Sequence, residues 1–154
     1  MTSPLRLVVR RTADVELPVE VSTRIPSDLD AVHESVEVLT RHAFAGIAST
    51  PECERYKNRL KTLLCEALAN AIVHGHAEDA SKYVAVRIEV ETTLVRVHVT
   101  DEGPGCDHSA PLLPLDPAAL DRETGRGLLM IQKLADSVQF NPQGNSICMT
   151  LRRP

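Results

Sequence analysis

The chain has 154 residues, 43% of them hydrophobic, which is enough for one core and predicts a single domain over residues 1–154. Its 17 basic and 21 acidic residues give a net charge of -4 without a block of one sign. Together with 3% aromatic residues, this argues against direct binding of nucleic acid. The N-terminus contains neither a signal peptide nor a membrane span, so we expect a cytoplasmic protein without membrane contact. Four scattered cysteines without a C-x-x-C pair predict free thiols.

The first third of the chain predicts two strands and a helix. Residues 5–11 and 20–25 are rich in Val, Leu and Ile with partial alternation, which is typical of strands. Ser27 or Asp28 then caps a helix that runs to about Ala45, with Gly46 as its stop. The apolar residues of this helix recur at steps of three and four positions: Leu29, Val32, Val36 and Leu39.

The middle of the chain predicts a long helix followed by a hairpin. Thr50 and Pro51 are typical of a helix start, because Thr accepts from a free N–H and Pro has no N–H to satisfy. The helix should end near His74 and Gly75. Residues 83–91 and 94–100 then alternate with a period of two, as hairpin strands do. The apolar stripe of the long helix consists of Tyr56, Leu60, Leu63, Leu64, Ala67, Leu68, Ala71 and Ile72.

The last third predicts a loop, a helix and a second hairpin. Residues 101–124 lack a regular pattern, and we expect a lid over about residues 102–124, which carries Arg122 but no lysine. Residues 127–135 are helical, and residues 138–140 and 146–151 form a hairpin that turns at residues 142–144. This order predicts an α/β (α+β) two-layer sandwich, with a mainly antiparallel sheet covered on one face by helices, because consecutive hairpins need no crossover.

Three polar residues project from one face of the long helix. Glu66, Asn70 and His74 are spaced i, i+4 and i+8, so each lies one turn above the next. The apolar stripe occupies neighbouring positions on the same helix. The polar ridge therefore either faces solvent or lines a pocket beside the core.

Two glycine-containing segments are candidates for the rest of such a pocket. D-E-G-P-G at residues 101–105 is either an ordinary turn or a place where a carboxylate and bare backbone meet a purine. T-G-R-G-L at residues 124–128 is either a flexible helix cap or a phosphate site made of free N–H groups and the helix dipole. Neither segment forms a P-loop or the G-x-G-x-x-G of a dinucleotide-binding helix.

Together, three motifs resemble the N, G1 and G2 boxes of the GHKL ATPases in order and spacing. They are E-A-L-A-N-A-I-V-H at residues 66–74, D-E-G-P-G at 101–105 and T-G-R-G-L at 124–128. The short chain, the lack of a phosphoacceptor helix and L-A-D at residues 134–136 look most like the bacterial anti-sigma factor serine/threonine kinases of partner-switching pathways. The resemblance implies the Bergerat ATP-binding fold.

The resemblance also implies a site for ATP and Mg²⁺. Asn70 would bind the magnesium ion, and Glu66 would orient or deprotonate the attacking hydroxyl, as phosphoryl transfer requires. Asp101 would bind the adenine amino group. The other nucleotide contacts that the boxes imply are Gly103, Gly105, Thr124, Gly125, Arg126, Gly127 and Leu128.

Two side chains in these boxes keep two interpretations each. His74 either touches the ligand or Glu66, or packs at the end of the helix. Arg126 either meets a phosphate or is solvated between two glycines. His76 adds only a weak zinc signal beside His74, because no cysteine or carboxylate follows at a suitable spacing.

An intact Glu66 beside Asn70 favours a kinase over a protein that only binds ATP. The resemblance implies that it phosphorylates a serine or threonine of a small STAS-type anti-sigma-factor antagonist, sequesters a sigma factor and forms a homodimer. A nucleotide-responsive binding module without transfer is the first alternative, because a lid with few cations would hold the γ-phosphate loosely. A detached catalytic domain of a histidine kinase is the second.

Overall fold

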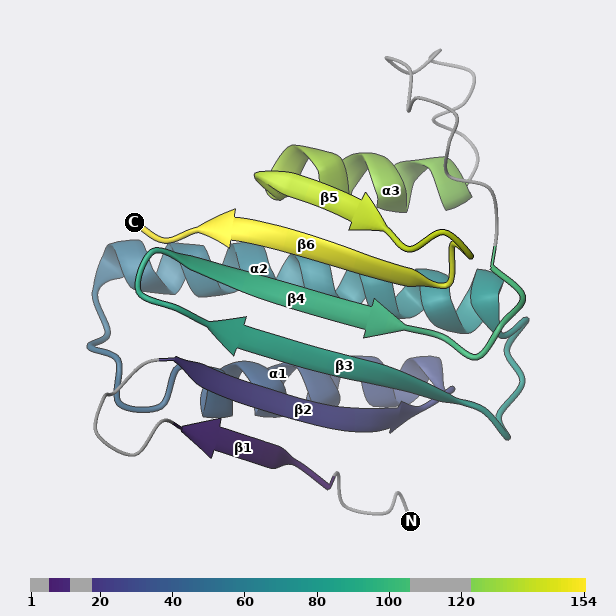
Figure 1. Cartoon of the computed structure of the whole chain (residues 1–154), viewed down its shortest axis with the longest axis horizontal. Helices are drawn as coiled ribbons and strands as arrows, with labels where there is room; N and C mark the ends of the chain where they lie inside the picture. Colours follow the sequence, from purple (N-terminus) through teal and green to yellow (C-terminus); the bar gives the residue numbers. More distant parts are fainter. Residues whose placement is uncertain (1–5, 12–17, 106–122) are drawn as a thin grey trace.

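The computed structural model describes residues 6–11, 18–105 and 123–154, without the side chains of Arg11 and of residues 123–126. The six strands of this part form one antiparallel sheet in the order β1-β2-β3-β4-β6-β5 (Figure 1). This confirms the mainly antiparallel sheet expected from the hairpins. The strands are β1 (Val8–Arg11), β2 (Val19–Pro26), β3 (Tyr83–Val90), β4 (Leu94–Thr100), β5 (Ser137–Phe140) and β6 (Ser146–Arg152).

The helices of the described chain lie together on one face of this sheet (Figure 1). Helix α2 packs between α1 and α3 and contacts both. The arrangement confirms the predicted two-layer sandwich. The helical elements are η1 (Leu29–Ala31, a 3-10 turn), α1 (Val32–Ala43), α2 (Pro51–Asn70), η2 (Ala71–Gly75, a π-helix) and α3 (Glu123–Leu134).

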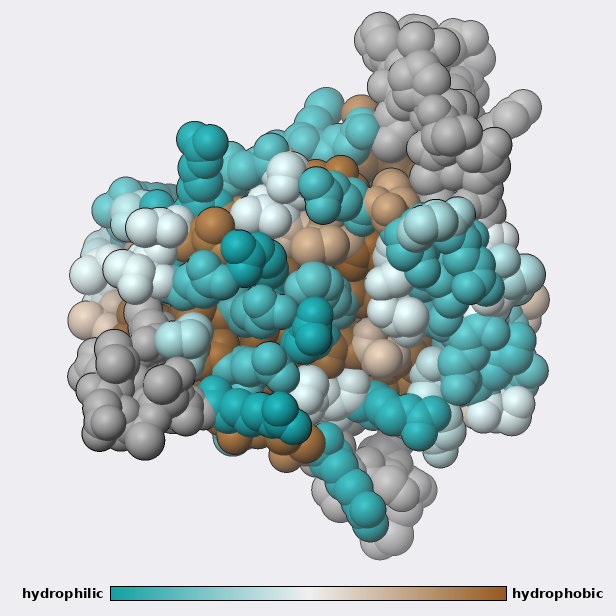
Figure 2. Space-filling view, in the orientation of Figure 1, coloured by the Kyte–Doolittle hydropathy of each residue, from teal (hydrophilic) through white to brown (hydrophobic). Residues whose placement is uncertain are grey.

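The core lies between the sheet and the helices. Alternate residues of β2, β3, β4 and β6 are buried against the helices, and the predicted stripe of α2 is buried from Tyr56 to Ile72. The opposite face of the sheet is open, and hydrophilic residues cover much of it in Figure 2, with hydrophobic residues between them. On that face Glu89 pairs with Arg87 at 3.1 Å and with His98 at 3.2 Å.

A local hydrogen bond begins α2 where the sequence predicts, whereas a capped 3-10 turn precedes α1. The Thr50 hydroxyl accepts from a backbone N–H of the first turn of α2 at 3.1 Å, and Pro51 occupies the first helical position. Asp28 accepts from the Asp30 N–H at 2.9 Å and so caps the 3-10 turn η1, whereas Ser27 is buried in another contact. Helix α1 itself begins after Ala31 without a side-chain cap, so neither candidate caps it directly. Leu29 differs from the prediction and is 43% exposed, because the 3-10 turn rotates it away from the apolar face of α1.

Several element ends also differ from the prediction. The first strand begins at Val8, and α1 ends at Ala43. Helix α3 begins at Glu123, so the glycines of T-G-R-G-L lie inside the helix instead of before it. Packing of this turn against α2 outweighs the low helix propensity of glycine. The predicted lid residues 106–122 lie outside the described residues. In the part of the chain that the structure describes, no helix is long and apolar enough to cross a membrane.

Candidate functional site

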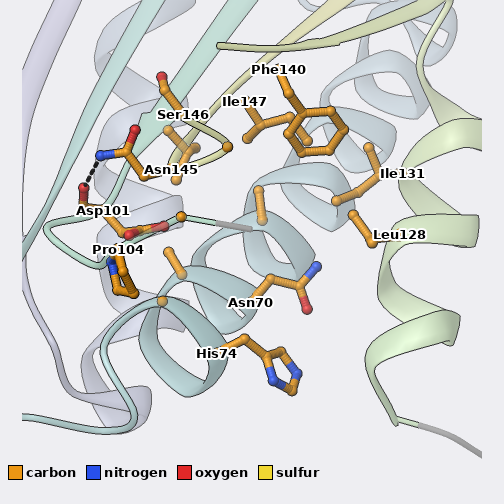
Figure 3. A pocket seen from close by; sticks show the side chains of 16 residues that line it. Asn70, His74, Asp101, Pro104, Leu128, Ile131, Phe140, Asn145, Ser146 and Ile147 are labelled. Atoms are coloured by element: carbon orange, nitrogen blue, oxygen red, sulfur yellow. Dashed lines mark hydrogen bonds between the residues drawn. The ribbon is translucent and has the colours of Figure 1, made fainter. Parts of the chain in front are cut away.

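A pocket of about 170 Å³ opens between α2, η2, α3 and the β5–β6 hairpin (Figure 3). A dry cavity of about 150 Å³ admits benzene, so this space suits one planar ring. One side of the pocket is apolar, with Leu128, Ile131 and Phe140. The other side carries Asp101, Pro104 and Asn145. The predicted site residues that line it are Asn70, His74, Asp101, Gly105 and Leu128.

The carboxylate of Asp101 stands at one end of this pocket, directly after β4. The Gly103 N–H donates to its Oδ1 at 2.7 Å. Gly75 packs so closely beside it that a Cβ on residue 75 would lie 2.5 Å from the Asp101 Cγ. Gly103 does not line the pocket, but lies against the carbonyl group of Gly75, where any side chain would collide with backbone. The two glycines thus let the loop after β4 cross close to η2, and they hold the Asp101 carboxylate in place.

The β5–β6 turn holds the same loop from the side of the sheet. The Asn145 side chain donates from Nδ2 to the Asp101 carbonyl oxygen at 3.1 Å (dashed in Figure 3). The backbone carbonyl oxygen of Asn145 accepts from the Asp101 N–H at 2.9 Å. Asn141 in turn accepts from the Gly144, Asn145 and Ser146 N–H groups at 2.8, 3.0 and 3.1 Å. The position of Asp101 is therefore tied to a rigid hairpin.

Glu66 and Asn70 meet α3 at Gly127, next to the pocket. A Cβ on residue 127 would lie 3.0 Å from the Glu66 Oε2 and 3.1 Å from the Asn70 Oδ1. The two oxygens therefore converge on one point of the α3 backbone, and only glycine leaves them undisturbed there. The amide oxygen of Asn70 is a hard ligand of the kind that Mg²⁺ prefers, so it fits the predicted metal, and Glu66 stands beside it.

Helix α3 is anchored to α2 at its C-terminal end. Arg59 donates from Nε to the Leu134 carbonyl oxygen, and its guanidinium lies 3.7 Å from Asp136. Thr124, Gly125 and Arg126 lie in the first turns of α3, and their side chains fall outside the described residues. Their contacts with phosphate remain predictions.

The two histidines at the end of the long helix have different surroundings. His74 is exposed and lines the pocket, projecting toward α3, so it does not pack into the core. His76 is 2% exposed and bonded to Ser27 and to the backbone of Glu102. No group of three metal-ligating side chains occurs among the described residues.

Cys65, the neighbour of Glu66 in the chain, is a free thiol, as are Cys53 and Cys148 among the described residues. Burial raises the pKa of the Cys65 thiol, and the Glu66 carboxylate raises it further. The thiol therefore stays protonated at neutral pH.

Sequence reasoning missed several residues that build the pocket. Asn145 and Phe140 come from the C-terminal hairpin, and Gly75 from the end of η2. The signal that could have found Asn145 is the pairing of β4 with β6, because it sets Thr100 opposite Ser146 and so places their chain neighbours together. Phe140 had a simpler signal, since it is one of 2 phenylalanines and ends a predicted strand.

Comparison with known proteins identifies the family of this chain. Residues 25–151 match the model of the histidine kinase-like ATPase domain, which confirms the family expected from the three boxes. An anti-sigma F factor of Bacillus thuringiensis is 30% identical over 111 residues, covering 70% of this chain and 73% of the relative. An anti-sigma F factor of Bacillus cereus is 29% identical and covers 64% of this chain and 68% of the relative. That of Geobacillus stearothermophilus is 32% identical and covers 56% of this chain and 60% of the relative. The chain therefore belongs to the histidine kinase-like ATPase domain family and is a relative of the anti-sigma F factors.

Proposed function

We propose that this protein is an anti-sigma factor serine/threonine kinase that binds ATP and Mg²⁺, phosphorylates a small STAS-type antagonist and sequesters a sigma factor. One observation carries the proposal: the Glu66 and Asn70 oxygens converge beside a pocket that ends at the Asp101 carboxylate. The similarity to anti-sigma F factors supports the choice of partners. The proposal includes a homodimer, which sedimentation of the purified protein would test.

The pocket suits adenine at its Asp101 end. A carboxylate accepts a hydrogen bond from the exocyclic amine of adenine, and the apolar wall with Ile131 and Phe140 covers the faces of the ring. Asp101 cannot turn away from the base, because Gly75 and Gly103 enclose its carboxylate. A fixed acceptor loses little conformational entropy on binding, which favours affinity.

Asn70 is the residue that would hold the magnesium ion through its side-chain oxygen. When bound, the metal neutralises charge that develops on the phosphates. Asn70 lies on the last turn of α2 and lines the pocket, while Glu66 stands one turn before it on the same helix. The nucleotide would therefore extend along the helix from Asp101 toward Glu66.

Glu66 acts on the attacking group in this mechanism. The hydroxyl oxygen of the antagonist forms a bond to the γ-phosphorus, the bond from that phosphorus to the β,γ-bridging oxygen breaks, and ADP leaves with its electron pair. The hydroxyl proton passes to the Glu66 carboxylate and then to solvent. Most of the rate comes from holding these groups in line, so the rigid α2 helix is a suitable platform.

The experiment is transfer of labelled phosphate to a STAS antagonist, comparing wild type with Glu66→Gln. We expect the variant to bind ATP and to lose transfer by about 100-fold or more, because a general base contributes roughly that much. Glu52→Gln is the matched control, since Glu52 is an exposed glutamate in the first turn of the same helix. Transfer by Glu66→Gln at the wild-type rate contradicts the proposal, and so does a wild type that leaves the antagonist unlabelled.

A second function is favoured by the contact of Gly127 with Glu66 and Asn70. A nucleotide that separates α3 from α2 would change the surface of the protein without any transfer, as in a nucleotide-responsive binding module. Such a module changes its affinity for a partner only if ATP binds its two states unequally. Calorimetry with the sigma factor distinguishes the two functions: a module without turnover changes affinity with ATP and leaves every partner unlabelled.

A further inference from the structure

The turn after η2 has a strained backbone. Ala77 and Glu78 both have positive φ, 48° and 58°, which residues with a side chain seldom adopt. The π-helix η2 ends directly before this turn. Its last hydrogen bond runs from the His76 N–H to the carbonyl oxygen of Ala71, five residues back, at 2.9 Å. Strain of this kind persists only where the surroundings fix it, and it often marks a functional position.

The turn aims the His76 side chain into the protein. Its Nε2 accepts from the Glu102 N–H at 2.8 Å, so that nitrogen carries no proton. The proton therefore belongs on Nδ1, which donates to the Ser27 hydroxyl at 3.0 Å. With 2% of its surface exposed, His76 is a buried link between the ends of β2, η2 and β4.

The bond to Glu102 fixes one particular peptide plane. The Glu102 N–H and the Asp101 carbonyl group belong to the same planar unit. The N–H donates to His76, and the carbonyl oxygen accepts from Asn145 Nδ2 at 3.1 Å. This plane is thus held on both sides, and its orientation sets the direction in which the Asp101 side chain leaves the backbone.

The Glu102 side chain ties the same residue to the sheet. Its Oε2 accepts from the Tyr83 N–H at 2.8 Å, and its Oε1 lies 3.5 Å from the Arg24 guanidinium. These two contacts lie at the exposed side of the loop, whereas His76 is the buried contact. Loss of the imidazole acceptor would leave the Glu102 N–H with no partner at the position where water is excluded.

We infer that His76 is a positioning residue for base recognition, which acts through the peptide between Asp101 and Glu102 to aim the Asp101 carboxylate at adenine. The inference rests on the proposed nucleotide site. A carboxylate in this position accepts from the adenine amino group and repels the carbonyl oxygen that guanine carries at the corresponding position. His76 therefore contributes to selectivity for adenine over guanine without touching the nucleotide.

The test compares three variants by the dissociation constants of non-hydrolysable ATP and GTP analogues. The amide of Gln reaches the position of Nε2, so His76→Gln restores an acceptor for Glu102 and should keep ATP affinity within about threefold. The shorter His76→Asn reaches only the position of Nδ1. We expect it to weaken ATP binding roughly tenfold, with little change for GTP, because the unpaired N–H lets the loop move.

Ser27→Ala is the matched structural control. It removes the partner of Nδ1 and lowers the unfolding temperature, but it keeps the bond from Glu102 to Nε2. Its preference for ATP over GTP should equal that of wild type. A role of His76 in folding alone would instead give equal losses for both nucleotides in His76→Asn, and this result overturns the inference.

The imidazole of the wild-type protein gives a test that needs no variant. ¹⁵N spectra should report His76 as the neutral tautomer with the proton on Nδ1, and a proton on Nε2 overturns the inference. A wild type that binds neither nucleotide refutes the proposed function and this inference together. A wild type that prefers ATP, with His76→Asn indistinguishable from it, refutes the positioning role alone.

Discussion

Substitution of Gly75 by alanine tests whether the close packing of η2 fixes the Asp101 carboxylate. The added Cβ would lie 2.5 Å from the Asp101 Cγ, whereas carbon atoms in contact prefer about 3.5–4.0 Å, so the carboxylate must move by about 1 Å. Overpacking of this kind costs about 1–3 kcal/mol, and replacement of a helical glycine returns about 1 kcal/mol. We expect a net loss of about 0–2 kcal/mol in the free energy of unfolding. ATP affinity should fall by tenfold or more, up to roughly 100-fold.

A double-mutant cycle isolates the cause of this loss. If Gly75→Ala acts by displacing the carboxylate, it should be neutral or slightly stabilising in an Asp101→Ala background, where no carboxylate remains to be displaced. Urea unfolding of the four proteins gives the free energies, and calorimetry with an ATP analogue gives the affinities. Equal destabilisation by Gly75→Ala in both backgrounds would refute the reasoning, because the methyl group would then collide with something other than Asp101.

Three further changes probe other parts of the molecule. Gly127→Ala places a Cβ 3.0 Å from the Glu66 Oε2, so transfer should fall at least about tenfold while the free energy of unfolding stays within about 0.5 kcal/mol, because helix propensity offsets the crowding. Arg59→Ala removes the donor to the Leu134 carbonyl oxygen, and hydrogen exchange should accelerate in the last turn of α3 more than in α1. Burial lowers the pKa of His98, so near the ordinary histidine pKa of about 6.5 the unfolded chain binds more protons than the folded protein. The free energy of unfolding, measured with urea, should therefore fall as the pH drops through that value, and it should fall less steeply in His98→Gln.

Local sequence patterns predicted the order of the main helices and strands, although not all of their ends. The stripe from Tyr56 to Ile72 fixes both the existence and the buried face of α2, because a period of 3.6 residues has no other explanation over that length. Thr50 fixes the start of that helix through a hydrogen bond within one turn, and Pro51 suits the first helical position because it has no N–H to satisfy. The ridge with Glu66 and Asn70 followed from the same geometry.

Contacts between distant segments were beyond such patterns. Nothing local sets β6 beside β4, yet that pairing puts Asn145 against Asp101. Helix α3 begins before Gly125 and Gly127 because it packs on α2, and intrinsic propensity alone favours a later start. The buried role of His76 depends on a π-helical end and two left-handed residues, for which the sequence has no glycine signal. These are tertiary effects, and they shape the site more than the fold.

The Asp101 end of the pocket and the Glu66–Asn70 pair beside Gly127 have different kinds of support, and this predicts different responses to ligands. The Asp101 end is held by hydrogen bonds from η2 and from the β5–β6 turn. The Glu66–Asn70 pair is covered by the Gly127 backbone of a helix that Arg59 anchors at its far end. In the proposed site, adenosine needs only the Asp101 end, whereas a triphosphate with its metal needs the space beside Asn70 that Gly127 occupies.

Adenosine should therefore leave hydrogen exchange in α3 unchanged, while ATP with Mg²⁺ should change it in the turn around Gly127 and spare the last turn near Leu134. Both ligands should protect the loop after Asp101, because both carry the adenine base that this loop is proposed to bind. Hydrogen–deuterium exchange with peptide resolution separates these segments. Equal effects of adenosine and ATP on α3 would mean that the base alone moves the helix. The Gly127 contact with Glu66 and Asn70 would then be a passive packing contact, and coupling between phosphate binding and α3 would have to be abandoned.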